Sequence, residues 1–167
     1  MKFGSILTVL FIAASLVTGC GFRPLYQKAE TDSGTTVVLD KVSIASIDGT
    51  IGQQLRNELI DRFYHHGYPS NAPYILTINL RETTRDIVIQ KDDVTSRAQI
   101  VVIAHYSLTE KETRQEISKG VVRSVGSYNI LGSQYATVVT RDTARDLALK
   151  ELADKMALRV AALLTIQ

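Results

Sequence analysis

The fold is decided by residues 74–128, which read YILTINLRETTRDIVIQKDDVTSRAQIVVIAHYSLTEKETRQEISKGVVRSVGSY. Three segments of this stretch alternate apolar and polar residues, which is typical of strands that bury one face. The segments are 74–80 with an extension through 83–89, then 96–109, and finally about 117–128. In the second segment the apolar positions are Ile100, Val102, Ala104, Tyr106 and Leu108. The turns between segments are too short for helical crossovers, so we expect an antiparallel meander.

An amphipathic helix is expected before the meander, from about residue 50 to 66. Its apolar residues recur at every fourth position, which places them on one helix face. They are Ile51, Leu55, Leu59 and Phe63. We expect Asp48 or Thr50 to cap the start of the helix, and Gly67 to end it in a left-handed conformation.

A second helix is expected from about residue 142 to 164, after a Gly- and Ser-bearing connection at 129–140. Residues 36–47 are rich in Val, Ile and Thr and predict a strand ahead of the first helix. The element order is then β-α-β-β-β-α, with the first strand at the edge or centre of the sheet. It predicts an α+β sandwich, with two helices packed on one face of a four-stranded mixed sheet. Residues 36–167 should form a single domain.

The N-terminus has the pattern of a lipoprotein signal peptide. Lys2 precedes a mostly apolar stretch at 6–17, and Leu16 to Cys20 read LVTGC, a lipobox. The apolar stretch is too short to span ~30 Å of hydrocarbon, which takes ~20 residues. We therefore predict that residues 1–19 are removed by cleavage between Gly19 and Cys20. The alternatives are an ordinary secretory signal with a chance cysteine, or an uncleaved anchor.

Cys20 is the only cysteine, so no intramolecular disulfide is available to an exported chain. Lipidation of its thiol by a diacylglycerol, with an acyl chain on its amine, would remove an unpaired thiol and anchor the protein firmly. No other cofactor is expected. Residues 20–35 would form the lipidated N-terminus and a polar tether. Gly21 stands where an Asp would resemble an inner-membrane retention signal, so we expect the periplasmic side of the outer membrane.

The composition argues against several classes of function. The formal net charge is +2, and loss of Lys2 lowers it to about +1, which does not indicate a nucleic-acid-binding protein. His65 and His66 are adjacent on the predicted helix and diverge by ~100°, so they do not form a chelating pair; His105 is expected on the sheet surface. No nucleophile elbow or Gly-rich phosphate loop is present. We predict neither catalytic residues nor metal ligands.

Basic residues are frequent on or near the ends of the predicted meander. They are Arg81, Arg85, Lys91, Arg97, Lys119 and Arg123. At one end of the sheet they could meet the phosphates of an anionic glycolipid, since Arg presents forked donors to phosphate. The alternative is a solvated sheet face with the acidic neighbours Glu82, Asp86 and Asp92.

Residues 20–26 read CGFRPLY, which resembles the start of mature alphaproteobacterial members of the LptE family, the lipopolysaccharide-assembly lipoproteins. The lipobox, the single α+β domain and the long C-terminal helix are similar to the family in architecture. The resemblance implies a non-enzymatic partner and plug of the outer-membrane β-barrel LptD. Such a protein assists barrel assembly and helps to bring lipopolysaccharide to the cell surface.

The resemblance also implies lipopolysaccharide binding through basic residues near the tip of a strand hairpin. Lys91 and Arg97 flank the matching turn, which also carries Asp92 and Asp93. Two other classes stay open. One is a lipid-anchored auxiliary subunit of another envelope transport or assembly complex; the other is a lipid-anchored enzyme or metal-binding protein, which the missing catalytic residues disfavour.

Overall fold

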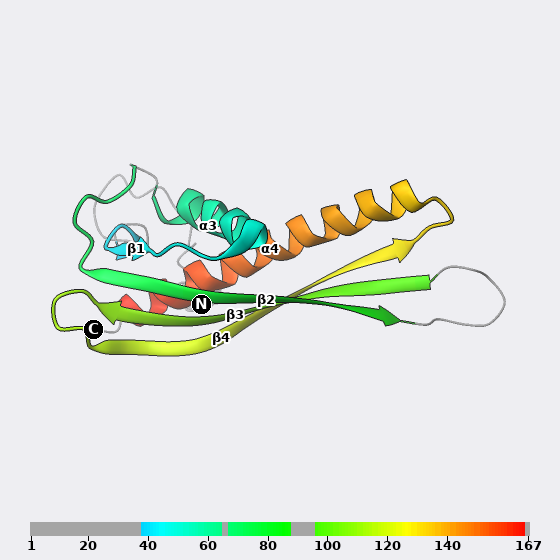
Figure 1. The fold of residues 1–167 in the computed structure, drawn as a ribbon. Coiled ribbons are helices and arrows are strands. Elements are labelled where there is room, and N and C mark those ends of the chain that lie inside the picture. Colours follow the sequence, from blue (N-terminus) through cyan, green and yellow to red (C-terminus); the bar gives the residue numbers. More distant parts are fainter. Residues whose placement is uncertain (1–37, 65–66, 88–95, 166–167) are drawn as a thin grey trace, which may run out of the picture. The chain divides into compact units, whose positions relative to one another are not determined.

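The computed structural model describes residues 38–64, 67–87 and 96–165, and both of its long helices lie on one side of a four-stranded sheet (Figure 1). The elements are β1 (Val42–Ile44), α3 (Gly49–Phe63), β2 (Tyr74–Ile87), β3 (Ser96–Glu110), β4 (Glu116–Ile130) and α4 (Gln134–Thr165). The strands lie in the order β1-β2-β3-β4, with β1 parallel to β2 and the remaining pairs antiparallel. This confirms the predicted α+β fold, with its mixed sheet and β-α-β-β-β-α order.

The three long strands confirm the predicted meander, and β4 extends slightly beyond the predicted 117–128 at both ends. β2 and β3 pair without interruption from Tyr74 opposite Glu110 to Ile87 opposite Arg97. β3 and β4 pair along almost their whole length, with one irregularity at Leu108/Thr109. Because β3 is paired on both sides, residues that share a cross-strand row keep fixed positions relative to one another.

The first strand is much shorter than the predicted 36–47. Only Val42 to Ile44 pair with β2, opposite Tyr74 to Leu76. Residues 38–39 form a helical turn instead, and the chain leaves the sheet after Ile44 to reach α3. Residues 36–37 lie outside the described part of the chain. β1 therefore occupies the edge of the sheet, one of the two places expected for it.

Helix α3 buries the predicted stripe but ends at Phe63, ahead of the predicted 66. Leu55, Leu59 and Phe63 are fully buried. Asp48 stands at the N-cap position without a side-chain cap bond. Tyr64 leaves the helix, and its buried hydroxyl donates to the carbonyl of Val42 at 2.7 Å. Burial raises the pKa of that phenol. Gly67 does have a positive φ, of 105°, but it lies beyond the helix end.

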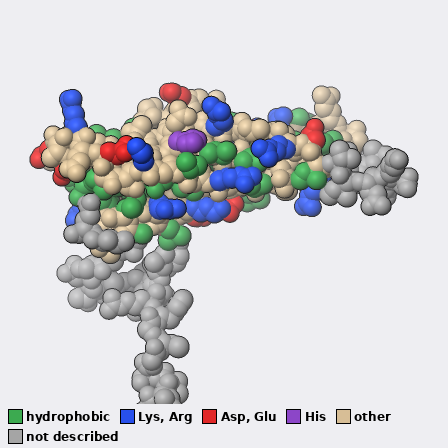
Figure 2. Space-filling model, turned by 90° about the horizontal axis from the view of Figure 1, so that it is seen from below, with side chains coloured by type: hydrophobic (Ala, Val, Ile, Leu, Met, Phe, Trp, Pro, Cys, Tyr) green, Lys and Arg blue, Asp and Glu red, His purple; other side chains and the backbone are tan. Residues whose placement is uncertain are grey.

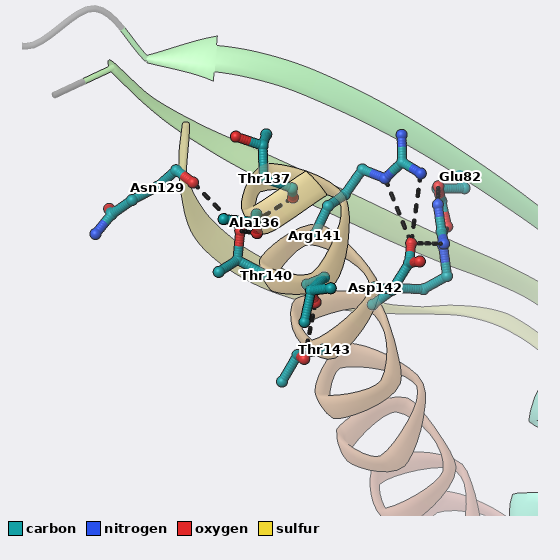
Figure 3. A network of polar contacts seen from close by, with 10 residues as sticks. Glu82, Asn129, Ala136, Thr137, Thr140, Arg141, Asp142 and Thr143 are labelled. Atoms are coloured by element: carbon teal, nitrogen blue, oxygen red, sulfur yellow. Dashed lines mark hydrogen bonds and ion pairs between the residues drawn. The ribbon is translucent and has the colours of Figure 1, made fainter. Parts of the chain in front are cut away.

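Helix α4 begins at Gln134, whereas the sequence predicted a connection up to residue 140 and a helix from 142. Ser133 caps it: its carbonyl accepts the Thr137 N–H at 3.1 Å and its hydroxyl accepts the Ala136 N–H at 3.5 Å. Threonine hydroxyls bond the preceding turn of the helix. The Thr140 hydroxyl donates to the Ala136 carbonyl at 3.1 Å (Figure 3), and the Thr143 hydroxyl donates to the Val139 carbonyl at 2.9 Å.

Helix α4 packs on the even-numbered residues of the meander, which form the core with α3. The buried strand residues include Leu76, Ile78, Ile100, Val102, Ala104, Tyr106, Leu108, Val122 and Tyr128. Gly126 sets how closely the layers approach, because a Cβ at this position would overlap the carbonyl of Ala144 in α4. Two carbonyls of the edge strand β4 also accept bonds from α4: Arg123 from Lys155 at 3.1 Å and Asn129 from Thr140 at 3.3 Å.

Candidate functional site

The meander has two faces of opposite character. We call the side under α3 and α4 the covered face and the other side the open face. The open face consists of the odd-numbered residues 75–87 of β2, 97–109 of β3 and 119–129 of β4. No described helix or strand packs on it, and Figure 2 looks directly onto it. In that view basic side chains run along the surface, with hydrophobic side chains between them.

Four arginines project from the open face. They are Arg81, Arg85, Arg97 and Arg123, and all are exposed. None of them forms an ion pair within 4.0 Å with a carboxylate of the described residues. A fifth basic residue, Lys119, differs from them because it pairs with Glu116 at 3.2 Å. The open face therefore concentrates positive charge that no carboxylate of the described residues pairs with, except at Lys119.

The acidic neighbours in the sequence do not share the face of these arginines. Glu82 faces the helices, where both of its carboxylate oxygens accept hydrogen bonds from Arg145 at 2.8 and 2.9 Å. Asp86 has the same even parity and lies on the covered side of β2. Asp92 lies outside the described residues. Glu82 and Asp86 therefore lie on the opposite side of the sheet from the four arginines.

The register divides the arginines into two pairs. Arg81 and Arg123 lie on either side of Ile103, so their Cα atoms are ~10 Å apart at a strand spacing of ~4.8 Å. Arg85 and Arg97 are diagonal neighbours on β2 and β3, at a Cα separation of ~7–8 Å. Along β2 the two pairs are four residues apart, which is ~14 Å at ~3.4 Å per residue.

Apolar side chains lie between and beside the pairs. The row that separates them is Thr83, Val101 and Val125. Val101 is buried, whereas Val125 is 37% exposed and Val121, beyond the Arg81–Arg123 pair, is 52% exposed. The open face thus combines guanidinium groups, which bind phosphate or carboxylate with two donors each, and exposed nonpolar surface.

The arginines on the covered side differ from those of the open face because they form ion pairs. Arg145 on α4 donates to Glu82 on β2 and to Asp142 at 2.9 Å. The hydrogen bonds to Glu82 raise the pKa of Arg145 above its ordinary value. Arg62 on α3 similarly pairs with Glu58 and with Asp154 of α4. These ion pairs join elements of the fold, so their arginines are not available to a ligand.

The structure tests only some of the predicted site residues. Arg97 is exposed on the open face, at the hairpin end of β3. Lys91 lies outside the described residues, as do Gly19, Cys20 and the His65–His66 pair. His105 is exposed on the open face, so its prediction as a sheet-surface residue is confirmed.

The sequence pattern grouped the basic residues by their nearness to the ends of the sheet. It did not predict that four arginines share one face. The available signal was that all four arginines have odd numbers, in strands whose side chains alternate between the two faces of the sheet. No group of three or more metal-binding side chains occurs in residues 38–64, 67–87 and 96–165. Within the same ranges, no helix combines the length and apolarity that crossing a membrane requires.

The chain matches one protein-family model, that of LptE, described as lipopolysaccharide-assembly, over residues 39–163. No curated protein sequence matches it. Among solved structures, a protein described as a lipoprotein from Caulobacter crescentus is similar, with a TM-score of 0.65 and 20% identity over 80% of this chain and 97% of that one.

Two further structures share the fold. A minor lipoprotein from Acinetobacter baumannii has a TM-score of 0.57 and 15% identity, over 72% of this chain and 90% of its own. The rare lipoprotein B from Shewanella oneidensis has a TM-score of 0.55 and 10% identity, over 72% of this chain and 93% of its own. At these identities the likeness shows a common fold.

Proposed function

The chain belongs to the LptE family of lipopolysaccharide-assembly proteins, and from this membership we propose that it is a non-enzymatic lipoprotein of the outer membrane. Its partner would be an LptD-like β-barrel, which it would plug and help to assemble. Its task would be to help deliver lipopolysaccharide through that barrel to the cell surface.

The observation that carries the proposal is the open face. Lipopolysaccharide is an anionic amphiphile, and the open face offers four arginines without carboxylate partners among the described residues. Arg97 lies at the hairpin end of this surface. Lys91 lies in sequence between β2 and β3, outside the described residues, and we propose Lys91 and Arg97 as the first lipopolysaccharide contacts at that end.

The lipobox supports the location. Cys20 would carry an S-diacylglycerol and an N-acyl chain, and two or more chains are needed for stable membrane attachment. Mass spectrometry of the N-terminal peptide of the membrane-extracted protein tests this step. We expect Cys20 as the first residue, with the mass of both modifications; an unmodified cysteine or a retained leader would contradict it.

The partner is tested by purifying the tagged full-length protein from gently solubilised outer membranes. We expect a stoichiometric β-barrel protein that a second outer-membrane lipoprotein, tagged in the same way, does not retain. Absence of a barrel would overturn the translocon role. Recovery of a different envelope complex would instead favour the auxiliary-subunit alternative.

Lipopolysaccharide binding is tested at the hairpin end by Lys91→Asp combined with Arg97→Asp. We expect affinity to fall ~10-fold or more, since each exchanged charge replaces attraction by repulsion. The matched control is Lys111→Asp with Arg114→Asp in the opposite turn of the meander, where both residues are exposed. Equal affinities of the two double variants would exclude the hairpin end as a contact.

A further inference from the structure

The arrangement of the open face indicates more than general basicity. We propose that it binds one amphiphile through two separate anionic groups, one held by the Arg81–Arg123 pair and one by the Arg85–Arg97 pair. The exposed apolar residues Val125, between the pairs, and Val121, beside the Arg81–Arg123 pair, would contact the nonpolar part of the same molecule. This inference rests on the proposed function and specifies its ligand: a lipid with two oxyanion groups, phosphates or carboxylates.

The first argument is that no carboxylate of the described residues pairs with the four arginines. Arg62 and Arg145 hold elements together through carboxylates at hydrogen-bond distance. The four arginines of the open face have no such partner among the described residues, and like charges gathered on one surface oppose folding. These four arginines therefore do not stabilise the fold through ion pairs with the described residues. An anion that binds to them would explain why they are gathered on this face.

The second argument is rigidity and spacing. All four arginines lie in strands that pair continuously, so the sheet, and not a loop, sets the positions of their Cα atoms. The two pairs are ~14 Å apart along β2. Two guanidinium groups converging on one anion supply up to four directed donors, so each pair can hold one oxyanion.

The third argument separates a lipid from a protein partner. Protein interfaces are enriched in aromatic residues, and their energetic centres consist largely of Trp, Tyr and Arg. The open face contains no Tyr, Phe, Trp or Met at its odd-numbered positions, and its nonpolar residues are all aliphatic. Exposed Val121 and Val125 beside arginines fit acyl chains next to charged head groups.

The test uses the full-length lipidated protein and three forms of lipid A with the same acyl chains. The forms carry two phosphates, one phosphate or none. We expect each lost phosphate to weaken binding by the wild-type protein ~10-fold. Equal affinities for all three forms would overturn the proposal.

The variants R81Q/R123Q and R85Q/R97Q identify the two positions. Each should bind the two-phosphate lipid ~10-fold more weakly than the wild type and lose most discrimination between two phosphates and one. The fourfold variant should bind all three forms alike. The matched control is Lys119→Gln, which removes a cation already paired with Glu116 on the same face and should change nothing.

Further measurements separate this inference from its competitors. Variants that keep lipid affinity but lose the β-barrel during purification would assign the arginines to a protein contact and overturn the lipid site. A loss with Lys91→Asp but with neither arginine pair would leave the proposed function intact and refute this inference. Unfolding midpoints of the arginine variants should equal or exceed that of the wild type, so a loss of affinity cannot be assigned to misfolding.

The role of Val121 and Val125 is tested with the deacylated two-phosphate head group and with inorganic phosphate. The head group should bind more weakly than the lipid, and inorganic phosphate should compete only at high concentration. If the head group binds as tightly as the lipid, the site is an oxyanion site alone, and the contact of the two valines is refuted.

Discussion

The two faces of the β2–β4 meander come from alternate residues of the same strands, yet they differ in both packing and charge. On the covered face Ile100 and Val102 are fully buried, and Glu82 neutralises Arg145. On the open face Arg81 and Arg123 lie exposed, without a carboxylate partner in the described part of the chain. The difference indicates that one face carries the stability of the domain, which leaves the other free for recognition.

The strongest way to break this division is Gly126→Ala on the covered face. The new Cβ would overlap the Ala144 carbonyl and push α4 away from β4, so we expect the free energy of unfolding to fall by about 3 kcal/mol. Urea denaturation followed by circular dichroism measures it. The adjacent Ser127→Ala on the exposed open face is the control and should stay within about 0.5 kcal/mol of the wild type. Equal losses in the two variants would contradict the division.

A smaller effect is expected from Glu82→Gln, which removes the charge that joins β2 to α4. Both partners are partly shielded, with side chains 17% and 20% exposed, and Asp142 still pairs with Arg145 afterwards. We expect a loss of about 1–2 kcal/mol in the same unfolding assay. Asp86→Asn is the matched control, on the same strand and side but exposed and without an ion pair to the described residues. A similar loss in Asp86→Asn would show that the removal of any negative charge from β2, and not the broken Glu82–Arg145 ion pair, causes the destabilisation.

The smallest effect is the pH dependence of the free energy of unfolding that comes from Glu151, which accepts a hydrogen bond from Ser124. Hydrogen bonds from Lys155 and from Ser124 lower the pKa of Glu151 below its ordinary value of 4.5. A lowered folded-state pKa stabilises the protein above pH 4.5, and this contribution is lost as the pH falls through the folded value.

Glu151→Gln should therefore cost less than about 1 kcal/mol at pH 7, since the carboxylate is exposed, and almost nothing at pH 3. Urea midpoints at the two pH values measure the difference. Asp146→Asn, exposed on the same helix, is the control and should stay within about 0.5 kcal/mol of the wild type at pH 7. A cost of Glu151→Gln that is equal at both pH values would exclude the carboxylate as the cause.

Much of the fold was predictable because local periodicity reports burial directly. The alternation from Ile100 to Leu108 predicted which side of β3 is buried, and the i+4 stripe of α3 predicted its core residues. The start of α4 was missed because the Gly and Ser residues of 129–140 suggest a connection. Ser133 caps the helix, and the hydroxyls of Thr137 and Thr140 bond carbonyls of the preceding turn, so the segment from Gln134 is helical despite its composition.

The candidate site was less predictable because it depends on register. Each basic residue was visible in the sequence, but Arg81 and Arg123 become neighbours only once β3 places Ile103 between them. Strand alternation places Glu82 on the opposite face from Arg81, but nothing in the local sequence identifies its partner Arg145, which is 63 residues distant. Pairing over such separations arises from tertiary packing.

The bonds that α4 makes to the carbonyls of β4 have a consequence for solubility. The outer edge of a sheet is a template for the strand of another molecule, and it favours growth into aggregates. Lys155 and Thr140 already occupy the carbonyls of Arg123 and Asn129 along this edge, and Lys155 adds a charge there. An incoming strand would have to displace both side chains, so the helix that covers one face also protects the edge against polymerisation.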